Sequence, residues 1–246
     1  MKKRGNVLIG TSGWHYKHWK GPFYPAGIPD DQLLTFYADK FRTVEINNTF
    51  YRLPEEDTLR QWGDATPEGF VFAVKAGRYL THMKKLKDAG PPLLTFLDTM
   101  SLLGKKLGPL LFQLPPNWRF DAERMRSFCG ALPATCRYAF EFRDRSWLNP
   151  QVYEILSGCG AAFCIYDFDG FRSPKAVTAD FVYVRLHGPD GPYKGRYKEN
   201  DLAGWAADIS QWRSQGKEIY CYFDNDERGL APNDALRLER LVRDRG

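Results

Sequence analysis

Three short stretches of the sequence place polar or charged residues on either side of an apolar one. These pairs are Glu45 and Asn47, Glu141 and Arg143, and Arg185 and His187. In a β-strand, residues two positions apart share a face, so each pair would point in one direction. Burying such groups is costly unless they pair with one another or hold a ligand. The spacing therefore predicts a polar pocket lined by several strands.

The residue types in and near these stretches indicate acid–base or covalent catalysis. A glutamate or a histidine can transfer protons, and Lys75 can hold an anion or form a Schiff base. Two carboxylates also suit glycoside hydrolysis, which depends on their separation. The candidate catalytic residues are Glu45, Lys75, Glu141 and His187.

Further polar and aromatic residues follow the ends of apolar runs and are candidates for substrate binding. They are Ser12, Trp14, Asn47, Phe50, Gln113, Arg143, Trp147, Asp167, Arg185 and Asn225. Some have simpler interpretations as well. Glu141 and Arg143 can form a structural ion pair, Gln113 can satisfy backbone groups, and Asp167 can cap a loop.

These residues need elements that bring them together. Eight runs rich in β-branched and aromatic residues are predicted strands, at 7–10, 43–46, 71–74, 109–112, 138–142, 162–166, 182–186 and 219–223. Amphipathic stretches lie between them, such as 29–41 with its aspartate cap and apolar face. Alternating strands and helices imply parallel pairing with right-handed crossovers.

The number of strands and the chain length predict an α/β fold, a single (β/α)8 TIM-type barrel over residues 1–246. The stretch 173–178 is weak, so the sixth helix should be degenerate. An open, doubly wound sheet is the alternative. In a barrel, the carboxyl ends of the strands meet at one mouth, where catalytic residues of this fold lie. The polar residues above follow those ends.

Composition favours a soluble, cytoplasmic protein with a large core. The chain has 246 residues, 43% of them hydrophobic, and no apolar run approaches the roughly 20 residues that span a membrane. Its five cysteines form no Cys-x-x-Cys pair, so reduced thiols are expected rather than disulfides or a structural zinc site. The formal net charge of +5 is compatible with an anionic ligand or nucleic acid.

A metal-dependent hydrolase is one alternative function. Glu45, Glu141, Asp167 and His187 are suitable ligands for a divalent ion. The sequence has no clustered histidine spacing, however, and Lys75, Arg143 and Arg185 follow the same strand ends. Because these cations would oppose a divalent ion, we expect no metal and no cofactor.

The stretch "HGPDGPYKGRYKEND" (187–201) follows the seventh predicted strand, where barrels commonly bind phosphate. Its glycines allow close backbone approach, and Lys194, Arg196 and Lys198 supply charge. A plain flexible loop is the alternative. The expected partner is a small or polymeric anionic ligand that carries phosphate or carboxylate.

A nucleic-acid-binding or ligand-binding barrel without turnover is a further alternative. Aromatic residues near the predicted mouth could stack on bases. They are Trp14, Trp19, Tyr24, Phe50, Tyr51 and Trp147. Packing of each ring against a helix is the simpler interpretation.

Seven motifs in order resemble the domain of unknown function 72 family, the YecE-like proteins. They are IGTSGWHYKHWKGPFYP, TVEINNTFYRLP, FVFAVKAGRYLTHMKKL, GPLLFQLPP, YAFEFRDRSW, FVYVRLHGP, and IYCYFDND with GLAPNDALRL. The resemblance runs from about residue 7 to residue 241 and implies a TIM-type barrel. It implies no activity, because none is established for the family.

The resemblance can be carried over to individual positions. Matching residues are Ser12, Trp14, Glu45, Asn47, Phe50, Lys75, Gln113, Glu141, Arg143, Trp147, Arg185, His187 and Asn225. One departure is Asp224, which stands where the family motif has an asparagine. The extra negative charge puts any role carried over to that position in doubt. Together, these observations favour a metal-independent enzyme that acts on a phosphate- or carboxylate-bearing substrate.

Overall fold

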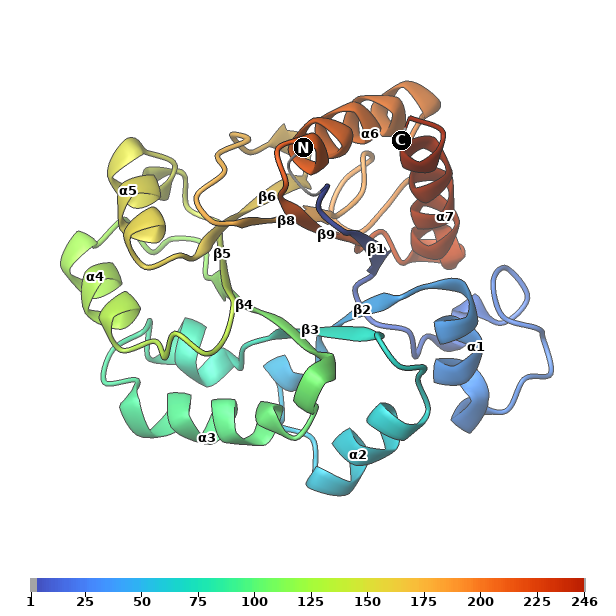
Figure 1. Ribbon diagram of the computed structural model, residues 1–246, viewed down its shortest axis with the longest axis horizontal. Helices are drawn as coiled ribbons and strands as arrows, with labels where there is room; N and C mark the ends of the chain where they lie inside the picture. Colours follow the sequence, from blue (N-terminus) through green and yellow to red (C-terminus); the bar gives the residue numbers. More distant parts are fainter. Residues whose placement is uncertain (1–3, 246) are drawn as a thin grey trace. The chain divides into compact units, whose positions relative to one another are not determined.

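Strands and helices alternate along the chain, as the sequence predicts (Figure 1). The structure, a computed structural model, describes residues 4–245. The strands are β1 (Val7–Thr11), β2 (Thr43–Ile46), β3 (Val71–Lys75), β4 (Leu107–Leu114), β5 (Tyr138–Phe142), β6 (Ala162–Phe168), β7 (Phe171–Arg172), β8 (Phe181–Leu186) and β9 (Glu218–Phe223). The helices are α1 (Leu33–Lys40), α2 (Glu56–Asp64), α3 (Gly90–Ser101), α4 (Ala122–Gly130), α5 (Pro150–Gly158), α6 (Glu199–Ser214) and α7 (Leu230–Arg243).

The hydrogen-bonded strands follow the order β1-β9-β8-β6-β5-β4-β3-β2. This order is sequential, whereas a doubly wound sheet reverses its direction partway. A parallel bridge between Ser12, directly after β1, and Glu45 in β2 links the first and last strands of the order. The prediction of a (β/α)8, TIM-type fold is confirmed, and the doubly wound alternative is wrong.

The described residues fall into two compact units. Unit 1 comprises residues 4–45, Ile165–Ser173 and 180–245, and unit 2 comprises Ile46–Cys164 and Pro174–Ala179. Residues 1–3 and 246 of the predicted single domain lie outside the described range. The single-domain assignment over 1–246 stays a prediction.

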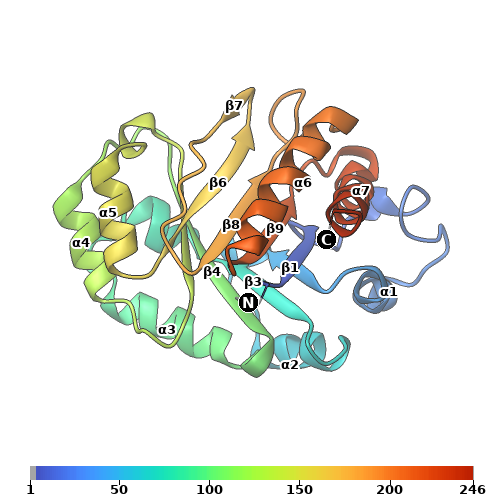
Figure 2. The same cartoon turned by 45° about the horizontal axis from the view of Figure 1, so that its top comes forward.

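In unit 1, β9 lies between β1 and β8, and both pairs are parallel (Figure 2). The register sets Thr11 opposite Phe223 and Arg185 opposite Tyr222. Helices α6 and α7 lie beside one another and cover these strands with Trp205, Ile209 and Leu238. This register brings the ends of β1, β8 and β9 to the same level, so the residues that follow them are neighbours.

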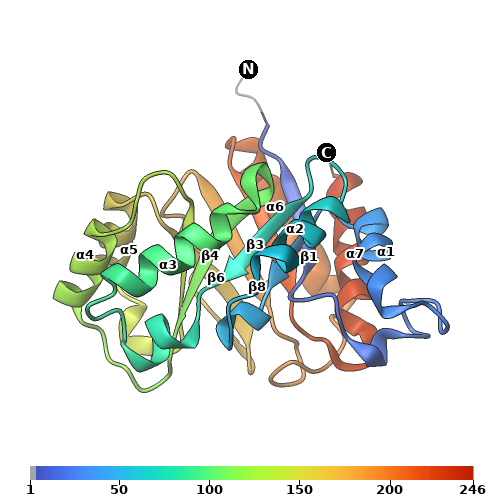
Figure 3. The same ribbon diagram turned by 90° about the horizontal axis from the view of Figure 1, so that it is seen from below.

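Unit 2 is built around β3, β4 and β5, which pair in parallel. Phe112 in β4 and Phe140 in β5 stack with their ring centroids 5.4 Å apart, and Phe128 of α4 meets Phe112 edge-on at 5.2 Å. Helices α4 and α5 lie side by side (Figure 3). Asp121 caps α4 through the Arg124 N–H, and Asn149 caps α5 through the Val152 N–H.

Some element boundaries differ from the predicted ones. β4 is longer than 109–112 and includes Gln113. The two-residue strand β7 was not predicted; it pairs antiparallel with β6. Residues 173–180 form no helix, so the sixth helix is degenerate as predicted. None of the helices within residues 4–245 has the length and hydrophobicity needed to cross a bilayer.

Tyr37 of α1 fixes the distance between β1 and β2. Its hydroxyl accepts from the Thr11 N–H at 2.9 Å and donates to the Thr43 carbonyl at 3.0 Å. Gly10 lies beside this contact, and a Cβ at that position would lie 2.3 Å from the Thr43 carbonyl oxygen and 2.9 Å from Tyr37 Oη. Only glycine therefore permits this close approach.

We expect Gly10→Ala to lower the free energy of unfolding by roughly 1–3 kcal/mol, because the added methyl group overpacks the junction. Urea unfolding measures this change. The matched control is Gly204→Ala, at an exposed position of α6 where an added Cβ meets nothing within 4 Å. It should be neutral or stabilising by up to about 1 kcal/mol. Equal effects of the two substitutions would contradict the close approach.

Candidate functional site

Glu45 is the buried acceptor at the centre of unit 1. Its Oε1 accepts from Ser12 Oγ, from Arg185 Nε at 3.1 Å and from Arg185 Nη2 at 2.8 Å. Its Oε2 accepts from Tyr183 Oη at 2.6 Å. Three of these contacts fall on Oε1 and one on Oε2, so both oxygens of the carboxylate are engaged by protein groups. Glu45 therefore orders its neighbours in this arrangement.

The guanidinium of Arg185 joins two carboxylates. Besides Glu45, its Nη2 donates to Asp224 Oδ2 at 3.0 Å and to Ser12 Oγ at 3.2 Å. Arg185 is fully buried, and a buried charge requires such pairing. Two carboxylates therefore share one cation, and its charge is already used within the protein.

His187 is oriented by the same two residues. Its Nδ1 lies 3.0 Å from Asp224 Oδ2, and its Nε2 lies 3.4 Å from Arg185 Nη1. Because a guanidinium can only donate, Nε2 must be the accepting nitrogen and the ring proton lies on Nδ1. At 3.4 Å the contact with Arg185 is weak. The arrangement is an imidazole oriented by a carboxylate, with Nε2 as its accepting nitrogen.

The surroundings of this cluster carry excess negative charge. Tyr16 Oη donates to the Ser12 carbonyl at 2.9 Å, and burial, followed by the charge of Asp224, raises the pKa of Tyr16. Burial and then Asp224 also raise the pKa of Asp226, although His18 partly offsets this.

A loop of residues 188–197 covers His187. The imidazole ring meets the Phe168 ring at 5.3 Å and the Tyr193 ring at 5.7 Å, both edge-on. Gly188 has a φ of 112°, and a Cβ there would lie 2.1 Å from the Lys194 carbonyl oxygen. The turn back onto residue 188 therefore requires glycine.

Asn225 fastens this loop. Its Nδ2 donates to the Gly195 carbonyl at 2.8 Å and to Asp234 Oδ2 at 3.0 Å. Asp234 is fully buried and also accepts from the Tyr197 N–H at 3.0 Å. In this conformation Asn225 positions the loop, and its role in substrate binding stays a prediction.

Asp167 belongs to a separate ion-pair group in unit 1. Its Oδ2 accepts from Arg172 Nε at 3.1 Å, and Arg172 also reaches Asp201 at 2.6 Å. Burial raises the pKa of Asp167, an effect that Arg172 partly offsets. The Asp167 carbonyl accepts from the His187 N–H at 2.9 Å, which connects β6 to the end of β8.

In unit 2, Glu141 and Arg143 form the ion pair that their spacing predicts. Arg143 Nη2 lies 2.5 Å from Glu141 Oε1, and both side chains are buried. Gln113 faces Glu141 across the β4–β5 register, and its Oε1 is buried without a hydrogen-bond partner. A buried, unpaired amide oxygen is unusual and is consistent with a binding role.

Lys75 and Phe50 also meet in unit 2. The Lys75 ammonium lies 4.6 Å from the centroid of the Phe50 ring, a cation–π contact.

Asn47 does not continue the alternation of β2, because β2 ends at Ile46 and the backbone of Asn47 has already turned to a helical conformation. The prediction that Asn47 shares a strand face with Glu45 is therefore wrong. Asn47 Oδ1 is buried without a hydrogen-bond partner.

The tryptophans predicted to bind substrate are packing residues in this conformation. Trp147 is fully buried, stacks on Phe142 at 4.9 Å and donates to the Trp118 carbonyl at 2.6 Å. Trp14 is buried, and its carbonyl accepts from Tyr24 Oη at 2.6 Å. Substrate binding by either residue stays a prediction that this burial disfavours.

Unit 1 thus brings together four of the predicted residues: Ser12, Glu45, Arg185 and His187. Two members of the cluster, Tyr183 and Asp224, were not among the predicted site residues. Tyr183 could have been found, because it lies two positions before Arg185 and so shares its strand face. Asp224 was noticed as a polar residue after the eighth predicted strand and as a departure from the family motif, but no role was predicted for it.

Within residues 4–245, no group of three or more His, Cys, Asp and Glu side chains is arranged to hold a metal ion. The expectation of a metal-independent site stays a prediction.

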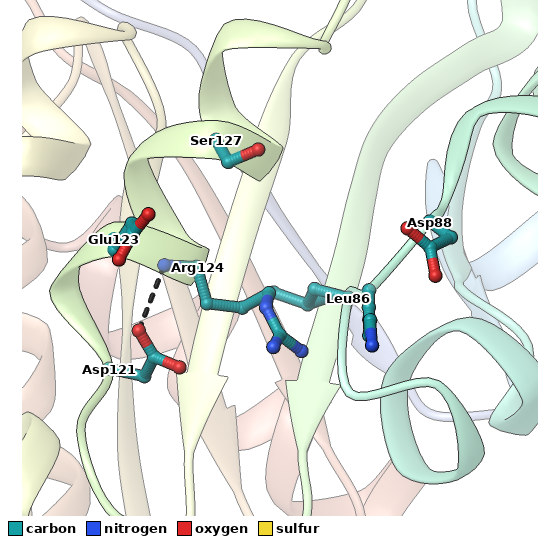
Figure 4. A pocket seen from close by; sticks show the side chains of 7 residues that line it. Leu86, Asp88, Asp121, Glu123, Arg124 and Ser127 are labelled. Carbon is teal, nitrogen blue, oxygen red and sulfur yellow. Dashed lines mark hydrogen bonds between the residues drawn. The ribbon is translucent and has the colours of Figure 1, made fainter.

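A cavity of about 320 Å³ in unit 2 carries mixed charge: Asp121, Glu123 and Arg124 line one side and Asp88 the other (Figure 4). Arg124 extends toward the loop of Leu86 and donates to the Lys85 carbonyl at 3.2 Å. Three acidic residues (Asp88, Asp121 and Glu123) and two basic residues (Lys87 and Arg124) line this cavity, so its charge does not point to an anionic ligand.

We expect Arg185→Met to lower the free energy of unfolding by about 3–5 kcal/mol, because it leaves Glu45 and Asp224 buried without their cation. Combining it with Glu45→Gln should recover part of the loss. The control is Arg172→Met, whose side chain is 51% exposed and whose loss should cost at most about 1 kcal/mol. Similar losses in urea unfolding for the two arginines would contradict the central role of Arg185.

His82 in unit 2 should titrate at about 4, because burial, then Lys75 and Arg78, lower its pKa. A histidine whose pKa is lowered on folding contributes stability above its unfolded pKa of about 6.5, and this stability is lost as the pH falls toward 4. A proton NMR titration measures the midpoint. Lys75→Met should raise it, whereas the control Lys105→Met should not. A midpoint near 6.5 in the unmodified protein would contradict this.

Comparisons with known proteins find relatives that cover from 60% to 97% of this chain. The UPF0759 protein YunF of Bacillus subtilis (strain 168) is 26% identical over 271 residues, covering 96% of this chain and 94% of the relative. The UPF0759 protein YecE of Escherichia coli (strain K12) is 28% identical over 148 residues, covering 60% of this chain and 50% of the relative. The crystal structure of a DUF72 family protein from Thermotoga maritima MSB8 is 29% identical, with a TM-score of 0.89 over 97% of this chain and 99% of that chain. The family described as "Protein of unknown function DUF72" matches residues 8–246, and the chain therefore belongs to this family.

Proposed function

We propose that the protein is a metal-independent acid–base enzyme that acts on a phosphate- or carboxylate-bearing substrate, with His187 as the proton-transfer residue. The observation that carries this proposal is the contact of His187 Nδ1 with Asp224 at 3.0 Å, which leaves Nε2 as the accepting nitrogen. A carboxylate in this position orients the ring and stabilises the imidazolium that forms when Nε2 takes a proton.

Glu45 and Arg185 support this chemistry by holding Asp224 and His187 in position. Both are buried and bound to one another, so they hold Asp224, and through it His187, in place. Their mutual occupation also supports a metal-independent reaction, because the oxygens of Glu45 already accept hydrogen bonds from protein groups. Proton transfer by His187 serves proton abstraction or, through an activated water, hydrolysis.

The loop of residues 188–197 and the residues just after it supply the charge for an anionic substrate. Lys194, Arg196 and Lys198 are exposed there, and Tyr193, next to Lys194, contacts the His187 ring. Glycines 188, 191 and 195 all have positive φ, a conformation that glycine adopts readily, so the loop can turn back over His187. An anion held by the loop cations would lie near the proton-transfer nitrogen.

Inorganic phosphate should raise the melting temperature above that in chloride of matched ionic strength. At a concentration about ten times its Kd, mass action stabilises the protein by roughly 1.4 kcal/mol, or about 3–5 °C. The double variant Lys194→Met/Arg196→Met should lose this gain. The control Arg240→Met/Arg245→Met, at exposed cations elsewhere in unit 1, should retain it. Equal gains in phosphate and chloride would contradict anion binding by the loop.

Turnover can be tested separately from binding. A panel of phosphorylated and carboxylated metabolites is incubated with the protein in the presence of EDTA, and consumption is followed by mass spectrometry. We expect His187→Gln to reduce any turnover by roughly 10²–10⁴-fold while the phosphate-induced stabilisation remains. Turnover that persists in His187→Gln, or that EDTA abolishes, would overturn the proposal.

A further inference from the structure

A second cavity in unit 2 combines aromatic and basic residues. It has a volume of about 250 Å³ and lies between the turn that follows β2 and the π-helix Tyr79–Met83 that follows β3. Its walls include Phe50, Tyr51, Arg52, Arg78, Tyr79 and Phe96. We call it the tyrosine pocket.

Two tyrosines at this pocket are exposed to solvent to an unusual degree. Tyr51 is 83% exposed and Tyr79 is 47% exposed. The Phe50 ring lies beneath, edge-on to Tyr51 at 5.1 Å and to His82 at 5.0 Å. By contrast, Trp14, Trp19, Tyr24 and Trp147, which the sequence also offers for base stacking, are buried. Among the aromatic residues considered for base stacking, Tyr51 at the tyrosine pocket is therefore the exposed one.

The backbone beside the pocket carries a run of positive charge. Between residues 75 and 87 there are five cations and no acidic residue: Lys75, Arg78, Lys84, Lys85 and Lys87. The lowered pKa of His82, caused by burial and then by Lys75 and Arg78, supports a positive potential beside the Phe50 ring that the imidazole contacts.

Backbone conformation also distinguishes this segment. The π-helical turn is followed by three non-glycine residues with positive φ: Lys85 at 48°, Leu86 at 63° and Asp88 at 47°. π-Helical turns and residues in the left-handed region are both frequent at functional sites. Lys84, at the end of this π-helical turn, has its ammonium 5.8 Å from the centroid of the Tyr79 ring, whereas Lys87 lines the neighbouring mixed-charge cavity.

We propose that the tyrosine pocket binds single-stranded nucleic acid, with one base in the cavity, stacked on Tyr51 and Tyr79, and the phosphates on the cations of residues 75–87. Exposed aromatic rings interleaved with cations are the means by which proteins bind single strands without reading their sequence. A run of five cations exceeds what one phosphate requires, so the charge favours a strand over a free nucleotide. This inference is independent of the proposed function in unit 1.

Fluorescence anisotropy with a labelled oligodeoxythymidylate of about 12 nucleotides tests the proposal. Tyr51→Ala and Tyr79→Ala should each weaken binding by roughly 5- to 100-fold. Tyr51→Phe should retain most of the affinity, because it keeps the ring, and Leu94→Ala, at an exposed apolar residue elsewhere in unit 2, should leave it unchanged. Equal affinities of Tyr51→Ala and Tyr51→Phe would overturn the stacking role.

The charge contribution is measured by the salt dependence between roughly 50 and 200 mM. Lys84→Met/Lys87→Met should lower the slope of log K against log[salt] by about 1 to 2, whereas the control Lys105→Met/Arg126→Met should not. Bound oligomer should also raise the NMR titration midpoint of His82 from about 4. An unchanged slope in the first pair, or an unchanged midpoint, would overturn phosphate contact at this segment.

Competition identifies the ligand class. Adenosine monophosphate that displaces the oligomer at an equal concentration would overturn the assignment to a strand in favour of a free nucleotide. Binding of vesicles with about one anionic lipid in three, together with no oligomer binding, would overturn it in favour of a membrane surface. Displacement by unlabelled oligomer alone would support it.

Discussion

The cluster in unit 1 depends on one buried cation. Arg185 lies between Glu45 and Asp224, and removing it would leave two buried carboxylates without their cation. The ion pairs of Arg185 therefore connect three elements: β2 contributes Glu45, β8 contributes Arg185, and Asp224 follows β9. The register of β8 with β9 and the bridge from Ser12 to Glu45 bring these positions together. The charges of the cluster can therefore pair only because the strands of unit 1 are arranged in this register.

The pairing of these buried charges also determines which polar residue of the cluster can take part in proton transfer. Glu45 accepts hydrogen bonds on both of its oxygens, and Arg185 is paired with two carboxylates, so both hold the cluster together. His187 differs, because the contact of its Nε2 with Arg185 is weak, at 3.4 Å. A residue type alone would rank a glutamate and a histidine equally as proton acceptors. Their hydrogen-bond partners separate them and favour His187.

Much of this was predictable from the sequence, and the remainder has physical causes. The barrel followed from alternating strand and helix patterns, and the pairs Glu141–Arg143 and Arg185–His187 followed from strand periodicity. Asn47 failed that rule because its strand ended one residue earlier, and local pattern places strand ends poorly. Trp147 was indistinguishable from a rim residue, because the groups that bury it, Trp118 and Phe142, are set by tertiary packing. Asp224 required knowledge of its partners.

The carboxylate of Asp224 changes the charge of the cluster. With the asparagine of the family motif, the position would offer an amide, and Arg185 would balance Glu45 alone. The carboxylate in this chain adds a second negative charge against the same guanidinium, and it raises the pKa of Tyr16 and of Asp226 in addition to the effect of their burial. Arg185 consequently has no positive charge to spare for an anionic substrate. If the cluster acts on an anion, the charge that holds it must come from outside the cluster, and in unit 1 the exposed cations beside His187 are those of the loop that covers it.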